Sequence, residues 1–190
     1  MSQTETRSIQ GVEIPEPGDW QLDPAHTSVT FTARHLMVSK VRGQFHGVSG
    51  NIHVSEDPLG SWVEVDVDPA SVETGDSKRD EHLRSPDFLD VERYPEITFR
   101  STRLEGEHPG GFRLEGDLTV HGVTRPVTLD VEYLGWTTDP WGGRRAGFSA
   151  TTEVDREDFG LTWNVALETG GVLVGKKAKL DFEIEAVKQG

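Results

Sequence analysis

Short segments in which apolar and polar residues alternate recur along most of the chain. In the clearest of them, every second residue is apolar from Ala178 through Phe182 to Ala186, and the residues between them are charged. Side chains of a β-strand point to opposite faces in turn, so each such strand has one dry and one wet face. The same alternation is found in six further segments: 27–35, 61–68, 97–103, 112–120, 127–133 and 146–155. Together they predict an antiparallel sheet with water on one face.

Seven or eight strands of this kind must either close into a barrel or stack as two sheets. The interior of a closed barrel of about eight strands accommodates side chains or one slender ligand. Small residues recur at positions expected to face inward: Ala33, Ser101, Gly116, Gly135, Ala146, Ala150 and Ala178. They either leave room for a ligand or mark bulges and close sheet packing, and the sequence leaves both interpretations open.

Two short segments between the strands have the composition of a helical turn or two. One is Leu36–Val41, and the other is Ser77–Leu83, for which Asp76 is a suitable N-cap and Pro86 a stop. No segment keeps a helical period for long, which argues against alternating strands and long helices. We therefore expect an all-β fold with one or two short helices near the mouth of the barrel.

The remaining segments are expected to form turns and a terminal arm. Residues 107–112, EHPGGF, predict a hairpin turn, since Pro109, Gly110 and Gly111 supply its unusual backbone angles. Residues 1–18 are polar, contain prolines and show no periodicity. We expect a flexible arm over 1–18 and a single β-barrel domain over 19–190.

The composition narrows the set of partners. Lys and Arg number 19 against 33 Asp and Glu, so the formal charge is −14. An acidic body repels nucleic acid and anionic membranes, so we expect no nucleic-acid partner. A local basic patch could override this repulsion, although the only short basic runs are Arg144–Arg145 and Lys176–Lys177. No apolar run approaches the roughly 18–20 residues that span a bilayer, so no stable membrane insertion is expected.

The residue types also limit the chemistry and the compartment. The absence of cysteine excludes disulfides and thiolate ligands. The first residues lack the apolar stretch of a secretory signal, which predicts a cytoplasmic protein. Histidines are scattered without metal-site spacing; a barrel could gather His35, His46 and His82, but we expect no metal and no cofactor.

The segment Arg79–Pro95, RDEHLRSPDFLDVERYP, concentrates charge between two predicted strands. Its Asp80 and His82 could supply a general base, or the charged residues could cap a helix and hold a loop in place. Its apolar Phe88 and Leu89 must lie on an apolar surface. This favours a lid over the mouth of the barrel, with Arg79 and His82 able to face an anionic head group.

The chain resembles the YceI family of bacterial lipocalin-like proteins. The resemblance rests on four stretches: WQLDPAHTSVTFTARHLMVSKVRGQF at 20–45, RDEHLRSPDFLDVERYPEITFRS at 79–101, LEGDLTVHGVTRPV at 114–127, and DREDFG with GVLVGKKAKLDFEIE towards the end. It implies an eight-stranded antiparallel barrel, often dimeric, with an apolar tunnel for an isoprenoid chain, either of a polyprenyl phosphate-like lipid or of a quinone. It implies no catalytic residues. Many members carry a secretory signal.

These observations lead to one preferred function and two alternatives. The preferred function is a non-catalytic carrier for an isoprenoid lipid or quinone, expected to act as a homodimer. The expected ligand-binding residues are Val29, Phe31, His35, Arg79, His82, Phe99, Leu118, Val131, Phe148 and Phe182. One alternative is an enzyme or stress-response factor that acts on an amphipathic small molecule through the cluster from Arg79 to His82. The other is an interaction module whose barrel is filled with side chains.

Overall fold

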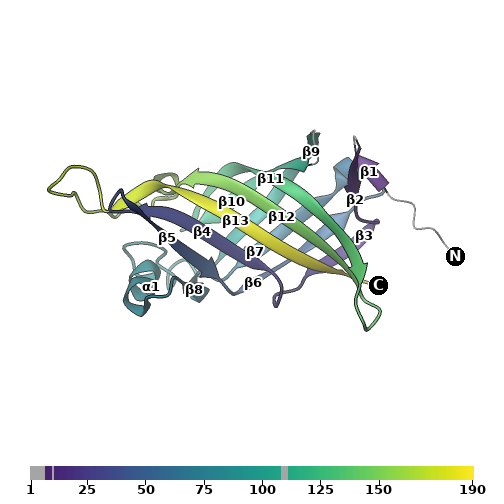
Figure 1. The fold of residues 1–190 in the computed structure, drawn as a ribbon, viewed down its shortest axis with the longest axis horizontal. Coiled ribbons are helices and arrows are strands. Elements are labelled where there is room, and N and C mark those ends of the chain that lie inside the picture. Colours follow the sequence, from purple (N-terminus) through teal and green to yellow (C-terminus); the bar gives the residue numbers. More distant parts are fainter. Residues whose placement is uncertain (1–6, 10, 108–110) are drawn as a thin grey trace.

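The alternating segments form long strands that curl around a common interior (Figure 1). The computed structural model describes residues 7–9, 11–107 and 111–190. The strands are β1 (Arg7–Ile9), β2 (Val12–Ile14), β3 (Gly18–Leu22), β4 (Ser28–His35), β5 (Ser39–Phe45), β6 (Val48–Val54), β7 (Trp62–Val67), β8 (Val72–Glu73), β9 (Ile97–Glu107), β10 (Gly111–Val120), β11 (Val123–Thr138), β12 (Arg144–Asp155) and β13 (Val174–Lys188). The helices are α1 (Ser77–Arg84) and the short 3₁₀ turns η1 (Pro58–Gly60), η2 (Pro69–Ser71) and η3 (Arg156–Phe159).

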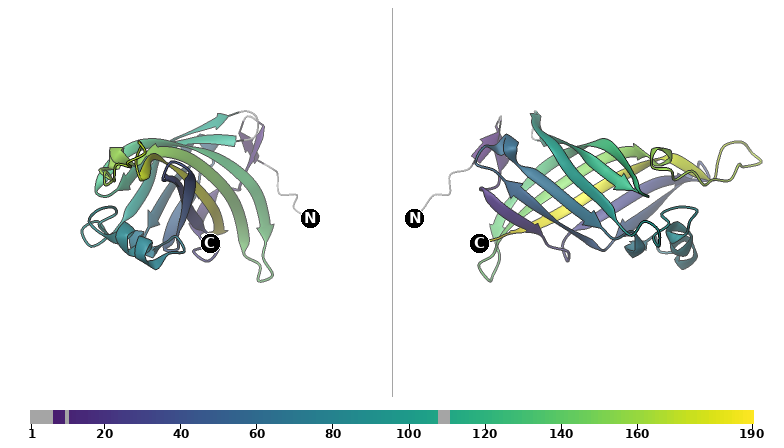
Figure 2. Two further views of the ribbon diagram at one scale, coloured as in Figure 1. Left: turned by 60° about the vertical axis from the view of Figure 1, so that its left-hand side comes forward. Right: turned by 180° about the vertical axis from the view of Figure 1, so that it is seen from behind.

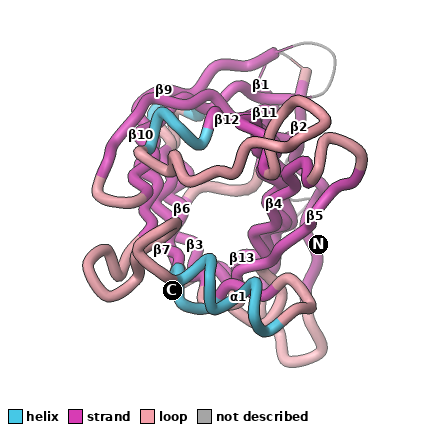
Figure 3. The backbone as a smooth tube through the Cα atoms, turned by 90° about the vertical axis from the view of Figure 1, so that its left-hand side faces the viewer, coloured by secondary structure: helices cyan, strands magenta, loops and turns pink. Residues whose placement is uncertain are grey.

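Pairing between β12 and β13 closes the sheet into an eight-stranded antiparallel barrel. Around the ring the order is β12, β11, β10, β9, β7, β6, β3 and β13. The strands β4, β5 and β8 continue β3, β6 and β7 past bends, because β3 and β4 pair with opposite ends of β13, and β5 pairs with both β4 and β8. The predicted barrel is thus confirmed, and Figure 3 views its ring from the end that carries α1.

The two ends of the barrel differ (Figure 2). At one end lie α1 and the loop that precedes β13; at the other lie β1, β2 and the turn between β11 and β12. The helix α1 begins as predicted, since the Asp76 carboxylate accepts hydrogen bonds from the backbone N–H of Lys78 (3.0 Å) and Arg79 (3.1 Å). None of the described helices is long and apolar enough to cross a membrane.

The small inward residues have two different roles. A Cβ added at Gly116 would lie 2.4 Å from the Phe99 ring and 2.6 Å from the Arg100 carbonyl oxygen, at a β-bulge between β9 and β10. Gly43 makes the same kind of room for the Phe31 ring. Ser101 at the bulge accepts a hydrogen bond from the Val63 N–H (2.8 Å). These residues serve packing and bulges, whereas three of the predicted alanines border empty space, as described below.

The prediction of a helix over Leu36–Val41 is wrong. Leu36 and Met37 form a tight turn between β4 and β5, with φ angles of 54° and 62°, and Val38 donates its N–H to the His35 carbonyl (3.3 Å). Such left-handed angles cost about 1–2 kcal/mol for each residue other than glycine. The β4–β5 ladder, from the Val29 to the His35 pair, overrides that cost and the local helical preference.

The described part of the expected N-terminal arm is more ordered than its composition suggests. β1 and β2 pair with each other between Arg7 and Ile14. The side chains of Ile14 and Pro15 are buried, and Ile14 packs beside Phe112 of β10. The division at residue 18 stays a prediction, but Ile14 and Pro15 border the interior of the barrel. The predicted turn at Pro109–Gly110 lies outside the described residues.

Candidate functional site

Two cavities lie end to end inside the barrel. The α1-end cavity, of about 170 Å³, is bordered by Leu83, Phe88 and Leu89 of the segment around α1. The β2-end cavity, of about 120 Å³, is bordered by Ile14 and Pro15 near β2. Val65, Phe99 and Phe182 border both cavities. Side chains from β7, β9 and β13 therefore form a partition across the middle of the barrel.

The walls of both cavities are almost entirely apolar. Among the described residues that border the β2-end cavity, Ser61 alone bears a hydroxyl, and its oxygen accepts a hydrogen bond from the Ser55 N–H (3.0 Å). The α1-end cavity has one charged neighbour among the described residues, Arg156. An interior of this kind offers a ligand contact with hydrocarbon and little else.

Arg156 is 7% exposed, and its charge is directed into the backbone rather than to the cavity. Its guanidinium donates to four carbonyl oxygens, those of Leu161 (2.5 Å), Gly175 (2.8 Å), Trp163 (3.0 Å) and Val174 (3.3 Å). Burial lowers the pKa of Arg156 from its usual value, and neighbouring carboxylates oppose that shift. The side chain thus connects η3 to the loop that leads into β13.

The structure places seven of the predicted ligand-binding residues on the cavity walls. Val29, Phe31 and Leu118 border the α1-end cavity, and Val131 and Phe148 border the β2-end cavity. Phe99 and Phe182 belong to the partition. Three predicted small residues also border cavities: Ala33, Ala150 and Ala178. Strand alternation alone located these positions; their contact with a ligand stays a prediction.

The three polar residues predicted for the site lie off the cavity walls. His35 ends β4, opposite Ser39 and Val174. The Arg79 guanidinium donates to the Thr74 hydroxyl (2.7 Å) and carbonyl (2.9 Å), and the buried Asp80 accepts from the Thr74 N–H (2.8 Å) and hydroxyl (2.6 Å). Arg79 and Asp80 therefore hold the connection between β8 and α1, the structural role that the sequence left open.

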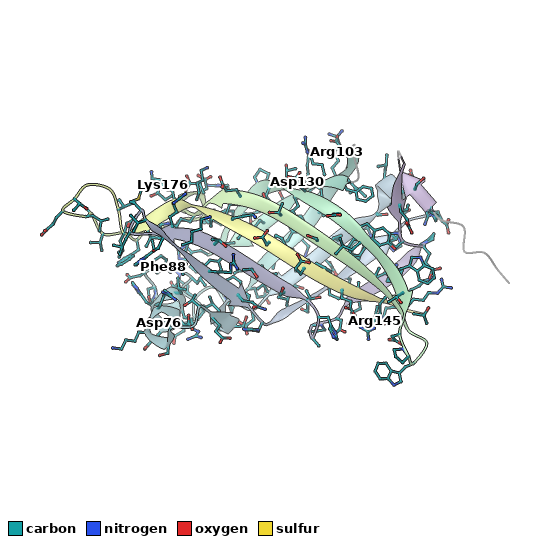
Figure 4. The ribbon with its side chains drawn as sticks, viewed as in Figure 1. Asp76, Phe88, Arg103, Asp130, Arg145 and Lys176 are labelled. Atoms are coloured by element: carbon teal, nitrogen blue, oxygen red, sulfur yellow. The ribbon has the colours of Figure 1, made fainter. Side chains whose placement is uncertain are left out.

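His82 lies one side chain away from the α1-end cavity. Its Nε2 is 2.9 Å from Asp87 Oδ2, and its ring stands edge-on to Phe88 (5.1 Å between centroids) and Trp163 (4.6 Å). Phe88 borders the cavity, so His82 supports the lid from behind. In Figure 4 Phe88 lies close to this end of the barrel. Leu83, Phe88 and Leu89 together cover the end, as their apolar character predicted.

Several wall and rim residues could not be found by alternation. Ile14 and Pro15 belong to the supposed arm, and Trp163 and Leu161 belong to an irregular segment after η3. Their only signal in the sequence is that apolar side chains stand in otherwise polar, turn-rich stretches. Sequence periodicity identifies strands and gives no information on such irregular segments.

The histidines do not gather into a metal site within the described chain. His46 pairs with Glu73 (2.6 Å) and His82 with Asp87, far apart in the sequence and on different elements. In the part of the chain that the structure describes, one group has ligand-like spacing: Asp23, His26 and Glu185. There Arg145 donates to both carboxylates at 2.7 Å, which makes the group an ion-pair network at the β2 end of the barrel.

The ion-pair network shifts the pKa values of its members. Hydrogen bonds from His26 and Arg145 lower the pKa of Asp23 to about 2, and the bond to Asp23 raises the pKa of His26. Arg145 also donates to Asp139 (2.9 Å) in the turn between β11 and β12. The network therefore joins β12, β13 and two turns.

Comparison with known proteins assigns the family. A model described as a YceI-like domain matches residues 20–186. A UPF0312 protein of Vibrio parahaemolyticus is 37% identical over 179 residues, which are 92% of this chain and 89% of that protein. The chain belongs to the YceI-like domain family.

Solved structures of similar proteins share the fold of this chain. The YCEI protein of Campylobacter jejuni has a TM-score of 0.70 at 28% identity, and the match covers 83% of this chain and 90% of that one. A polyisoprenoid binding domain from Saccharophagus degradans, implicated in plant cell wall breakdown, has a TM-score of 0.67 at 16% identity. That match covers 92% of this chain and all of the other, and at this identity it shows the fold alone.

Proposed function

We propose that this YceI-like protein binds an isoprenoid lipid non-catalytically and carries it with the hydrocarbon chain held inside the barrel. The observation that carries the proposal is the pair of apolar cavities that lie end to end and share Val65, Phe99 and Phe182. A long, slender hydrocarbon is the ligand shape that such a row of cavities accommodates. The polyisoprenoid binding domain with the same fold supports this choice of ligand class.

The energetics favour a prenyl chain over a compact polar ligand. Each buried CH₂-sized unit of hydrocarbon stabilises the complex by about 0.8 kcal/mol. A polar group placed in the same walls without a hydrogen-bond partner costs roughly 1–3 kcal/mol. The head group, of a polyprenyl phosphate-like lipid or of a quinone, must therefore remain at an end of the barrel. We place it at the α1 end, where His35, Arg79 and His82 are found.

An enzymatic role through the cluster from Arg79 to His82 is the weaker hypothesis. Asp80 has its carboxylate occupied by Thr74, and Arg79 donates to the same residue. His82 paired with Asp87 is the one arrangement there that resembles an oriented base. In the carrier, prenyl-lipid binding should survive His82→Ala, because the apolar walls that hold the hydrocarbon remain. Turnover that the variant abolishes would support the enzyme. The homodimer and the cytoplasmic location stay predictions.

Filling the cavities one at a time tests the proposal. Ala33→Leu adds bulk to the α1-end cavity and Ala150→Leu to the β2-end cavity. Thr32→Leu, on the outer face of β4, is the matched control. We expect both alanine variants to bind added decaprenyl phosphate or ubiquinone at least about tenfold more weakly than the control, because each loses room for two or more CH₂-sized units. Equal affinities in all three folded variants would contradict binding inside the barrel.

A further inference from the structure

The turn between β4 and β5 presents three consecutive apolar side chains to solvent. Leu36 is 41% exposed, Met37 50% and Val38 84%. We call residues Leu36–Val38 the β4–β5 tip. Two-residue hairpin turns of this left-handed kind favour Asn and Gly, because those residues adopt positive φ easily. Turn formation therefore does not account for Leu36 and Met37, and neither does burial.

The β4–β5 tip is joined to a second exposed apolar residue on the neighbouring loop. Leu36 donates its N–H to the Leu173 carbonyl (2.8 Å), and Leu173 donates to the Val165 carbonyl (2.9 Å). Val165 is 46% exposed. Figure 1 shows this loop, ahead of β13, projecting beyond the barrel beside the end of β4. The tip and Val165 thus form an apolar surface at the α1 end.

Basic residues that are dispersed in the sequence gather behind this surface. Strand pairing sets Arg34 opposite Lys40 and places Arg42 two residues further along the same outer face of β4 and β5. All three are exposed, and none forms an ion pair with any described residue. Lys177 on β13 adds a fourth exposed cation. Acidic residues near Lys177 are Asp155, which stands opposite it in the β12–β13 ladder, and Glu157, which pairs with Lys176 (3.1 Å). Glu168 lies on the loop ahead of β13.

The opposite end of the barrel has exposed apolar residues beside cations that, in the described part of the chain, are held in ion pairs or by backbone carbonyls, as Arg7 is by those of Ser55 and Glu56. Trp141 is 87% exposed and Trp136 45%. There Arg145 pairs with Asp23 and Glu185, while Arg144 and Lys188 both pair with Glu16. Figure 4 shows Lys176 and Arg145 towards opposite ends of the molecule. Among the described residues, the α1 end combines exposed hydrocarbon with a cluster of cations, Arg34, Lys40 and Arg42, that form no ion pair.

We propose that the β4–β5 tip docks the protein onto an anionic lipid bilayer. Leu36, Met37 and Val38 enter the outer part of the bilayer, and Arg34 and Lys40 lie against its head groups. This local attraction acts within about 10 Å, so it overrides the −14 charge of the whole body only in this orientation. Ala33 and Val174, which border the α1-end cavity, flank the tip, so docking sets that cavity beside the membrane.

Vesicle flotation tests docking separately from isoprenoid binding, because the vesicles contain no prenyl lipid. The wild-type protein should float with vesicles of equal parts phosphatidylglycerol and phosphatidylcholine, and not with pure phosphatidylcholine. Val38→Asp, at an exposed site, should abolish flotation. Arg34→Gln with Lys40→Gln should weaken binding about fivefold per charge, the ratio for about 1 kcal/mol per basic residue, and added salt should weaken it further. Trp141→Asp, at the opposite end, is the matched control and should float as the wild type does.

Two results would overturn docking through this surface. One is a wild-type protein that does not float with anionic vesicles. The other is a Val38→Asp variant that floats as the wild type does. That second result would count against docking also if Val38→Asp dissociated a dimer. Met37→Gly guards against misfolding as an explanation. Glycine suits the φ of 62° at this position, so the variant should be at least as stable as the wild type and still bind vesicles more weakly.

Discussion

At the scale of single residues, the barrel interior leaves few polar groups to satisfy, and Tyr133 is the informative exception. Its hydroxyl is buried and has no hydrogen-bond partner among the described residues, and its ring lies next to that of Phe148 (5.3 Å between ring centroids). Burial raises the pKa of Tyr133 to about 12, and the charges of Glu13 and Glu16 add to the shift. The hydroxyl therefore remains a neutral donor that costs stability in the free protein.

Removing that hydroxyl should stabilise the fold. Tyr133→Phe is expected to raise the free energy of unfolding by about 1 kcal/mol, because an unsatisfied buried hydroxyl costs about 1–3 kcal/mol. Urea unfolding at neutral pH measures the change. Tyr94→Phe, at a half-buried tyrosine outside the cavities, is the control and should stay within about 0.5 kcal/mol of wild type. A destabilised Tyr133→Phe would show that the hydroxyl has a partner.

Asp23 and its partner His26 make the free energy of unfolding depend on pH, each at a different end of the pH range. Hydrogen bonds from His26 and Arg145 lower the pKa of Asp23 to about 2, so its contribution is present above the unfolded value of about 3.9 and is lost as pH falls towards 2. The pKa of His26 is raised by Asp23, so its contribution is present below about 6.5 and is lost as pH rises through the folded value.

The difference in urea midpoint between wild type and Asp23→Asn should therefore be largest between about pH 4 and 6.5. It should shrink on the acidic side as Asp23 is protonated and on the alkaline side as His26 loses its charge. Midpoints measured at several pH values from 3 upward, roughly one unit apart, trace this curve. A difference that stays constant with pH would contradict the assigned network.

At the scale of elements, strand geometry depends on close contacts that glycine permits. Gly116→Ala should lower the free energy of unfolding by about 1–3 kcal/mol, because its Cβ would meet both the Phe99 ring and the rigid Arg100 carbonyl. Gly147→Ala on β12 is the matched control, since its Cβ would meet Leu134 at an ordinary 3.5 Å. Chemical denaturation of the two variants measures their free energies of unfolding. Equal free energies of unfolding would contradict the close contact of Gly116 with Phe99 and Arg100 at the bulge.

The sequence predicted those elements whose residues alternate and missed those that depend on distant pairing. The positions of Phe99, Leu118 and Phe182 followed from period two alone, and α1 followed from Asp76 and Pro86. The β4–β5 tip did not, because the ladder formed by β4 and β5 sets its backbone, and local composition favoured a helix. The bulge at Gly116 and the burial of Ile14 likewise arise only when separate strands meet.

At the scale of the whole molecule, closure of the barrel separates an apolar interior from a surface of uneven charge. The acidic composition led us to expect repulsion from anionic membranes, because only runs of basic residues can be seen in a sequence. Strand register gathers Arg34, Lys40 and Arg42 into a patch that no run revealed. This patch lies at the same end as the α1-end cavity, and the β2-end cavity continues the apolar interior towards the other end. We expect this arrangement of a lipid carrier.

Native mass spectrometry of the freshly purified protein, followed by organic extraction, tests the isoprenoid carrier most directly. An isoprenoid carrier should give a complex heavier than the 21.0 kDa chain, or than twice that mass for a homodimer. It should also yield an extracted lipid whose fragments are spaced by isoprene units, and whose head group identifies it as a polyprenyl phosphate or a quinone. Protein at its bare mass, which also takes up neither added ubiquinone nor added polyprenyl phosphate, would contradict isoprenoid binding in the barrel.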